Sequence, residues 1–184
     1  MPYLFAQAVE CCRDGLPLLR AMVVEFPGNR TRQTLDQQYM LGDSLLVAPV
    51  FNEEGVCEYY VPVGTWMGLL DGKKRVGPAW VKETFDSFHL PLLLREDQVL
   101  LVGTGEHPDY DWAAGLTKVV VGSVSERGAR EALIPSAKEL GQFEGSVRVL
   151  SVWRDDAEPE SLGVERTGQG EAPELLVLGD DSHI

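Results

Sequence analysis

Residues 58–84 read EYYVPVGTWMGLLDGKKRVGPAWVKET, and this stretch decides the fold class. Short runs rich in Val, Tyr and Trp alternate there with turn residues, which is typical of β-strands. Asp71-Gly72 is a hairpin signal, and Pro62–Gly64 is interpreted as another connection. We predict strands at 58–61, 65–70, 79–84, 92–95 and 99–102. Several short strands at this spacing predict an antiparallel β-sandwich.

The N-terminal residues have a different pattern. Pro2 and Gly15 suit the start and the end of a helix over residues 2–14. Leu18–Phe26 is a nearly continuous apolar run between two prolines. Such a run predicts a parallel strand that is buried on both faces.

The next residues add one more helix and one more strand. Thr34–Gln37 matches a capping box and predicts a short helix through Leu41, ended by Gly42. Leu45–Phe51 predicts another buried apolar strand. A helix with one or two such strands indicates the end of an α/β domain. We therefore interpret the chain as the tail of a longer enzyme.

The C-terminal half continues the strand pattern with weaker turn signals. We predict strands at 117–121, 130–134, 147–153 and 175–178. They suit a second, smaller sheet. Residues 154–174 are rich in Glu, Gly and Pro and are expected to form an exposed, partly mobile loop.

Composition excludes several classes of protein. The chain has 184 residues, 44% of them hydrophobic, as in a globular protein. Its net charge of −13 repels phosphate backbones, so no nucleic-acid partner is expected. The sequence has no run of ~18 apolar residues, so no membrane-spanning helix is predicted. The first residues lack the basic region of a secretory signal.

Three cysteines occur in the chain: Cys11, Cys12 and Cys57. Their number is odd and they have no CxxC or His/Cys ligand spacing, so neither a disulfide framework nor a metal site is predicted. We expect free thiols in a reducing, cytoplasmic compartment, and no cofactor.

Several stretches together resemble glycoside hydrolase family 31. Their order and spacing are similar to the last barrel helix and strand of that family and to the β-domains that follow: Met1–Phe5, Leu18–Pro27, Leu35–Phe51, Tyr60–Trp66, Leu90–Glu96 and Pro108–Trp112. Within the family, Arg20–Met22, Glu25–Pro27 and Gln38–Asp43 are most similar to the α-xylosidases. Gly28–Arg30 departs from the resemblance, because two aspartates and a proline are usual there.

The resemblance, which covers residues 1–112, implies three parts when it is combined with the strand pattern of the later residues. Residues 1–42 would be the terminal segment of a (β/α)8 catalytic barrel, 43–106 a proximal β-sandwich, and 107–184 a partial distal β-domain. It also implies a retaining mechanism, with a nucleophilic aspartate and an acid/base aspartate about 5–5.5 Å apart. In the family both lie on earlier barrel strands, so we assign no catalytic, substrate-binding or metal-binding residue to this chain.

The carboxylates of the chain are expected to be structural. Asp36 and Asp43 suit helix ends and turns, and residues 155–158 contain a solvated acidic run of Asp155, Asp156 and Glu158. Glu25 is expected to pair with Arg20 or another basic residue. A supporting role in an active site is the alternative for Glu25, because barrel strands display such groups at their ends.

Histidines and tryptophans also have a structural and a functional interpretation. His89 is expected in a core or a turn, His107 in inter-domain packing and His183 in a disordered terminus. For His107 a sugar site is the alternative. Four tryptophans are expected mostly in cores, with a sugar-stacking surface as the alternative: Trp66, Trp80, Trp112 and Trp153.

Two hypotheses of function follow. The first is a C-terminal fragment that supports the barrel of an α-xylosidase-like enzyme, which would release terminal α-linked xylose or glucose from oligosaccharides. The alternative is a free-standing β-sandwich that binds carbohydrate or mediates oligomerisation. We also expect self-association through exposed apolar residues of 18–26, and higher solubility when residues 1–34 are deleted.

Overall fold

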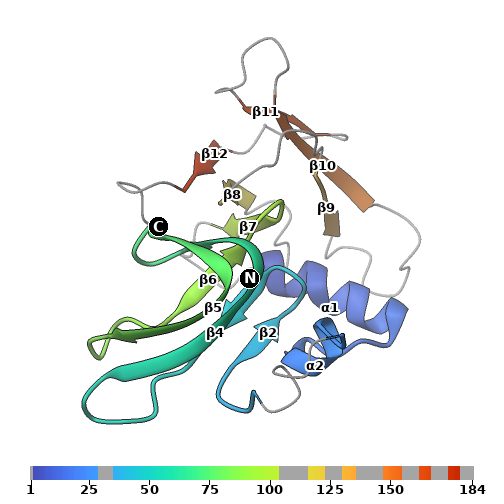
Figure 1. Ribbon diagram of the computed structural model, residues 1–184. Helices are drawn as coiled ribbons and strands as arrows, with labels where there is room; N and C mark the ends of the chain where they lie inside the picture. The colour runs from blue at the N-terminus through green and yellow to red at the C-terminus, as the bar shows by residue number, and fades with distance from the viewer. Residues whose placement is uncertain are drawn as a thin grey trace. The chain divides into compact units, whose positions relative to one another are not determined.

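The computed structural model describes residues 2–28, 35–103, 116–122, 130–135, 147–154, 162–166 and 174–178 (Figure 1). The chain divides into two compact units. One consists of residues 1–16 with 97–177, and the other of residues 17–96 with 178–184. Strands, mostly in antiparallel pairs, dominate the described residues of both units. The predicted mostly-β class is therefore confirmed.

A six-stranded antiparallel sheet forms the unit of residues 17–96. Its spatial order is β1-β2-β3-β6-β4-β5. The strands are β1 (Leu19–Ala21), β2 (Tyr39–Leu41), β3 (Leu45–Val47), β4 (Val56–Gly68), β5 (Lys74–Thr84) and β6 (Leu92–Arg95). Large apolar side chains that are less than 2% exposed fill its core, among them Tyr59, Met22, Trp66, Met40 and Leu46.

The β4–β5 hairpin contains the stretch that decides the fold. Gly72, at φ 65°, lies in its turn, so the predicted Asp71-Gly72 hairpin is confirmed. The predicted connection at Pro62–Gly64 is wrong, because β4 continues through it. The register shifts there between Val61 and Gly64, as in a β-bulge. Proline and glycine within a strand pattern mark a bulge as readily as they mark a turn.

The prediction of one parallel strand at Leu18–Phe26 is wrong. β1 pairs antiparallel with β2, and Met22–Glu25 form a single helical turn, α2. Met22 and Phe26 are buried, whereas Val23 and Val24 are exposed. That i, i+4 spacing places the two buried residues on one helical face. A short apolar run cannot be divided into strand and helix by hydrophobicity alone.

The predicted capping-box helix at 34–41 is also wrong. Residues 35–38 are not helical, and Tyr39–Leu41 form β2. The Gln38 side chain donates from Nε2 to the Tyr60 carbonyl at 2.9 Å and accepts from the Tyr60 amide at 2.7 Å. The Gln38 side chain therefore makes the two hydrogen bonds with the Tyr60 backbone that a neighbouring strand would otherwise make. Gly42, at φ 66°, lies in the β2–β3 turn, and β3 covers only the first three residues of the predicted strand 45–51.

Helix α1 (Pro2–Asp14) begins the other unit and confirms the predicted helix. Gly15, at φ 72°, ends it by donating its amide to the Cys11 carbonyl at 2.9 Å. α1 packs against strands of both sheets of its unit, β7 (Val99–Gly103) and β9 (Arg130–Pro135).

The described residues of that unit also form two three-stranded sheets. In one sheet, β8 (Leu116–Val121) lies between β7 and β12 (Glu174–Val177). β8 runs antiparallel to β7 and parallel to β12. In the other, β10 (Val147–Arg154) lies between β9 and β11 (Leu162–Arg166), antiparallel to both. β11 falls inside the segment 154–174 that was predicted as one loop, so that prediction is wrong for residues 162–166. Residues 155–161 and 167–173 lie outside the described residues.

Candidate functional site

A buried arginine links two carboxylates on the β4–β5 hairpin. The Arg75 Nη2 atom lies 2.7 Å from Asp71 Oδ2 and 2.8 Å from Glu83 Oε2, and the arginine is 7% exposed. The Tyr59 hydroxyl donates to the same Glu83 oxygen at 2.6 Å. Asp71 is supplied by the turn, Tyr59 by β4, and Arg75 and Glu83 by β5. The hairpin register brings these four residues together.

Burial and pairing shift the pKa values of this cluster in consistent directions. Burial favours a higher pKa for Asp71, but hydrogen bonds from Arg75 and from the Lys73 amide outweigh it, so the pKa lies below its ordinary value. Burial favours a lower pKa for Arg75, but the hydrogen bonds of Arg75 to Asp71 and Glu83 outweigh burial and raise that pKa. Burial and then the bond to Glu83 raise the pKa of Tyr59. The cluster is therefore a fixed ion-pair network with a protonated phenol.

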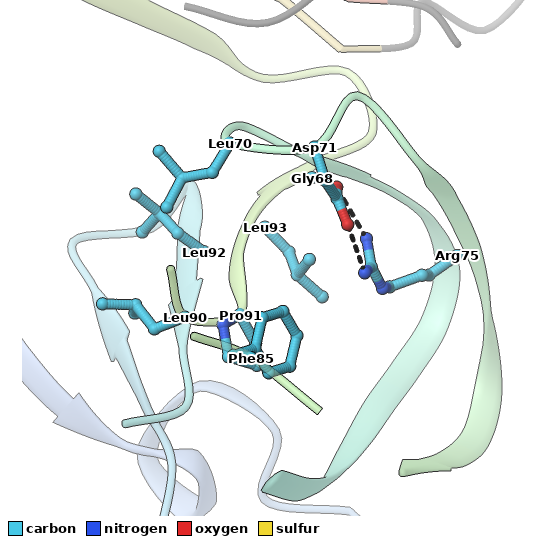
Figure 2. A pocket seen from close by; sticks show the side chains of 9 residues that line it. All are labelled: Gly68, Leu70, Asp71, Arg75, Phe85, Leu90, Pro91, Leu92 and Leu93. Carbon is cyan, nitrogen blue, oxygen red and sulfur yellow. Dashed lines mark hydrogen bonds and ion pairs between the residues drawn. The ribbon is translucent and has the colours of Figure 1, made fainter. Parts of the chain in front are cut away.

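A small cavity lies beside Arg75 and Asp71. Figure 2 shows the ion pair on one side of the cavity and the side chains of Phe85, Pro91 and Leu93 on the other. Its volume is about 10 Å³. That is about the space of one water molecule, whereas ligand pockets measure roughly 300–1,000 Å³. This cavity does not have room for a sugar ring.

Glu25 lies between two arginines in the same unit. Its Oε2 is 3.3 Å from Arg20 Nη1 and its Oε1 is 3.0 Å from Arg95 Nη1. The expected ion pair with Arg20 is thus confirmed. Arg20 also donates from Nε to the Pro17 carbonyl, and the Arg95 guanidinium lies 5.2 Å from the centre of the Phe26 ring. Through these ion pairs Glu25 ties α2 to β1 and β6.

The other candidate carboxylates and histidine lie in loops. Asp36 is exposed in the segment before β2, where no helix forms. Asp43 lies in the β2–β3 turn and accepts the Ser44 hydroxyl at 2.7 Å. His89 is exposed, with its Nδ1 atom 2.6 Å from Asp86 Oδ1, so its turn role is confirmed. The His89 hydrogen bond, followed by the Phe88 amide, lowers the pKa of Asp86.

The tryptophans differ from one another in burial. Trp66 is a core residue that donates to the Pro62 carbonyl at 3.0 Å, whereas Trp80 is 54% exposed. Trp153 lies on β10, for which only the backbone is described. Other candidates from the sequence lie outside the described residues: Trp112, His107, His183, Asp155, Asp156 and Glu158.

The cysteines are free thiols. Burial, followed by the charge of Glu83, raises the pKa of the Cys57 thiol. The Cys57 Sγ atom lies 3.6 Å from the Ala48 carbonyl oxygen. Among the residues that the structure describes, no three His, Cys, Asp or Glu side chains are grouped to hold a metal ion. In the same described ranges, no helix has the length and apolar character to cross a membrane.

The sequence did not single out the Arg75 network. One signal could have found it. Arg75 and Glu83 occupy alternate positions of β5 in phase with Val81, which packs against the core. Charged side chains on the inward face of a strand predict a buried ion pair. Asp71 was interpreted only as a turn residue.

Comparisons with known proteins identify the domain. Residues 15–100 match the glycosyl hydrolase family 31 C-terminal domain. An α-xylosidase from Emericella nidulans is 38% identical over 143 residues, which are 73% of this chain and 18% of that protein. The α-xylosidase XylQ of Lactiplantibacillus pentosus is 38% identical over 105 residues, which are 55% of this chain and 14% of that protein. The chain thus spans less than a fifth of these relatives.

Solved structures agree on the fold. The family 31 α-xylosidase from Xanthomonas citri has a TM-score of 0.73 at 21% identity, covering 97% of this chain and 20% of its own. A Listeria monocytogenes protein has a TM-score of 0.78 at 24% identity, covering 96% of this chain and 17% of its own. These structures share the fold of the chain, and the family match assigns residues 15–100 to the C-terminal domain of glycosyl hydrolase family 31.

Proposed function

We propose that this chain is the C-terminal part of a retaining α-xylosidase-like glycosidase. The complete enzyme would release terminal α-linked xylose or glucose from oligosaccharides. The observation that carries the proposal is the 38% identity to two α-xylosidases across a family 31 C-terminal domain. The nucleophile and the acid/base would be supplied by barrel strands of the complete enzyme.

The carboxylate geometry supports a structural role for this part. Glu25 is held by Arg20 and Arg95, and Asp71 and Glu83 are held by Arg75. A nucleophile and an acid/base must instead face a bound sugar across about 5–5.5 Å. Carboxylates fixed by arginines stabilise the sheet and leave the chemistry to the catalytic barrel.

We also propose that helix α1 is the part of this chain that belongs to the catalytic barrel. The sequence divided the chain at residues 42 and 106. Two observations support an earlier first boundary, near residue 15: the domain match begins there, and β1 pairs antiparallel within the six-stranded sheet. The free thiols Cys11, Cys12 and Cys57 support a cytoplasmic location for the protein.

Enzyme assays test the proposed function. The purified chain should not hydrolyse aryl α-xylosides or aryl α-glucosides. A chimera of the Lactiplantibacillus pentosus α-xylosidase, with this chain in place of its own C-terminal part, should hydrolyse the α-xyloside. The matched control is the same chimera carrying Met22→Asp, which places a charge in the core and should abolish activity by unfolding the domain.

Two outcomes would contradict the proposal. One is turnover by the isolated chain that survives purification and disappears with Glu25→Gln, because it would place an active site here. The other is a chimera that folds, as judged by its circular dichroism, but has no activity on either substrate.

A further inference from the structure

An apolar patch lies on the outer side of β1 and α2. Leu19 is 60% exposed, Val24 46% and Val23 38%. Ala21, two residues from Leu19 on the same side of β1, is exposed as well. These four residues form the β1–α2 patch, which lies within one short stretch of the chain. β1 is also an edge strand of the six-stranded sheet, in which it pairs with β2 on one side.

Ion pairs and core contacts fix the backbone beneath the β1–α2 patch. Glu25 of α2 is bound by Arg20 of β1 and by Arg95 of β6, at 3.3 and 3.0 Å. On the inner side of α2, Met22 and Phe26 are buried in the core. The inner positions are thus occupied, so the apolar side chains of the patch stay in solvent unless another surface covers them. A surface that is fixed in this way loses little conformational entropy when it binds.

Chain connectivity selects the surface that covers the patch. Helix α1, which we propose belongs to the catalytic barrel, ends at Asp14, and β1 begins at Leu19. The residue steps from Asp14 to Leu19 span at most about 18 Å, because an extended chain advances about 3.3–3.6 Å per residue. The barrel is therefore tethered within that distance of the start of β1. A tether this short gives the barrel a much higher effective concentration at the patch than a free partner has.

Most of a complete enzyme would lie outside this chain. The chain matches 18% and 14% of the length of the two α-xylosidase relatives. A second copy of the chain, by contrast, is not tethered and reaches the patch only at its own free concentration. It would bind there when the barrel is missing, which agrees with the self-association expected for the isolated chain.

We propose that Leu19, Val23 and Val24 form a docking surface for the catalytic barrel of the complete enzyme. The inference rests on the proposed function and names the surface through which this part would support the barrel. Apolar side chains of the barrel would cover the patch and exclude water from it. In the isolated chain the same patch is open.

The test compares the isolated chain with the α-xylosidase chimera that carries it. Leu19, Val23 and Val24 are replaced together by Ser in both proteins. In dilute solution the melting temperature of the isolated chain should change by less than about 2 °C, because exposed side chains contribute little to stability. The melting temperature of the chimera should fall by at least about 4 °C, because the replacement removes apolar area that the barrel buries.

A second triple replacement is the matched control. Phe51, Val63 and Val76 are 70%, 65% and 62% exposed and lie outside the patch. Their replacement by Ser should change the melting temperature of the chimera by less than about 2 °C.

Four results would overturn the docking surface. The first is a chimera whose melting temperature does not change with the replacement in the patch, and the second is an equal fall in the isolated chain. The third is an equal fall in the chimera that carries the control replacement. The fourth is a dimer of the chimera, seen by analytical ultracentrifugation, that the replacement in the patch dissociates, because the patch would then bind a second copy. An inactive wild-type chimera instead contradicts the proposed function, so the two failures are distinguishable.

Discussion

Arg75 separates two carboxylates that would otherwise repel each other. Its side chain is 6% exposed, while those of Asp71 and Glu83 are 27% and 29% exposed. Arg75→Met keeps most of the volume and removes the charge. Because the carboxylates retain some solvent, we expect the free energy of unfolding to fall by about 2–4 kcal/mol. Urea denaturation, followed by the fluorescence of the tryptophans, measures the change.

The exposed pair Lys82–Glu58 provides the control for this prediction. Both side chains are more than half exposed, so Lys82→Met should change the free energy of unfolding by less than about 1 kcal/mol. Equal losses in the two variants would show that burial does not matter for Arg75.

Acid should reveal the same network. The pKa of Asp71 in the folded protein lies below its ordinary value of about 3.9. A depressed carboxyl pKa stabilises the fold above that ordinary value, and the stabilisation is lost as the pH falls through the folded value. Below about pH 4, the urea concentration at the unfolding midpoint of the wild type should therefore decrease as the pH is lowered, and it should decrease less steeply in Arg75→Met. A wild-type midpoint that is constant across this range would contradict the prediction.

At the scale of elements, the bulge in β4 depends on Gly77 of β5. A Cβ atom at Gly77 would collide with the Pro62 carbonyl and lie 2.5 Å from the Val61 carbonyl oxygen. Both obstacles are backbone, so they cannot rotate away. Gly77→Ala should lower the free energy of unfolding by about 1–3 kcal/mol. Gly28→Ala is the control, because nothing lies within 4 Å of a Cβ there. Equal melting temperatures for the two variants would contradict this account.

Elements with strong local signals could be predicted from the sequence. Helix α1 has Pro2 and Gly15 at its ends, and the β4–β5 turn has Asp71-Gly72. The segments that failed depend on distant partners. Gln38 uses its side chain to bond the Tyr60 backbone, 22 residues away, and that contact favours the extended chain over a capping-box helix.

The polar clusters were predictable only where the partners are close in sequence. The Arg20–Glu25 pair spans five residues and was expected. Arg95 joins Glu25 from 70 residues away, and Tyr59 joins Glu83 from 24 residues away. Such contacts require the sheet order and the strand register. Neither is contained in local hydrophobic periodicity.

At the scale of the whole molecule, the apolar run Leu18–Phe26 divides between core and surface. Leu19, Val23 and Val24 are exposed, which supports the expected self-association. Met22 and Phe26 are buried with Met40, so these two residues of the run do not contribute to an exposed apolar surface. Self-association itself stays a prediction. Replacing Leu19, Val23 and Val24 together by Ser should shift the size-exclusion elution of the chain towards the monomer.

The division of this run reverses the expected effect of deleting residues 1–34. The deletion removes Met22 and Phe26 from the core, and burying each contributes about 1.5–3 kcal/mol. It also leaves Met40 without two of its neighbours. Against a total stability of about 5–15 kcal/mol, we expect a markedly lower melting temperature and more aggregation in the shortened chain. The triple Ser variant, which keeps this core, should be at least as soluble as the wild type. If the shortened chain is monomeric and has the same melting temperature as the full chain, α2 does not stabilise the sheet.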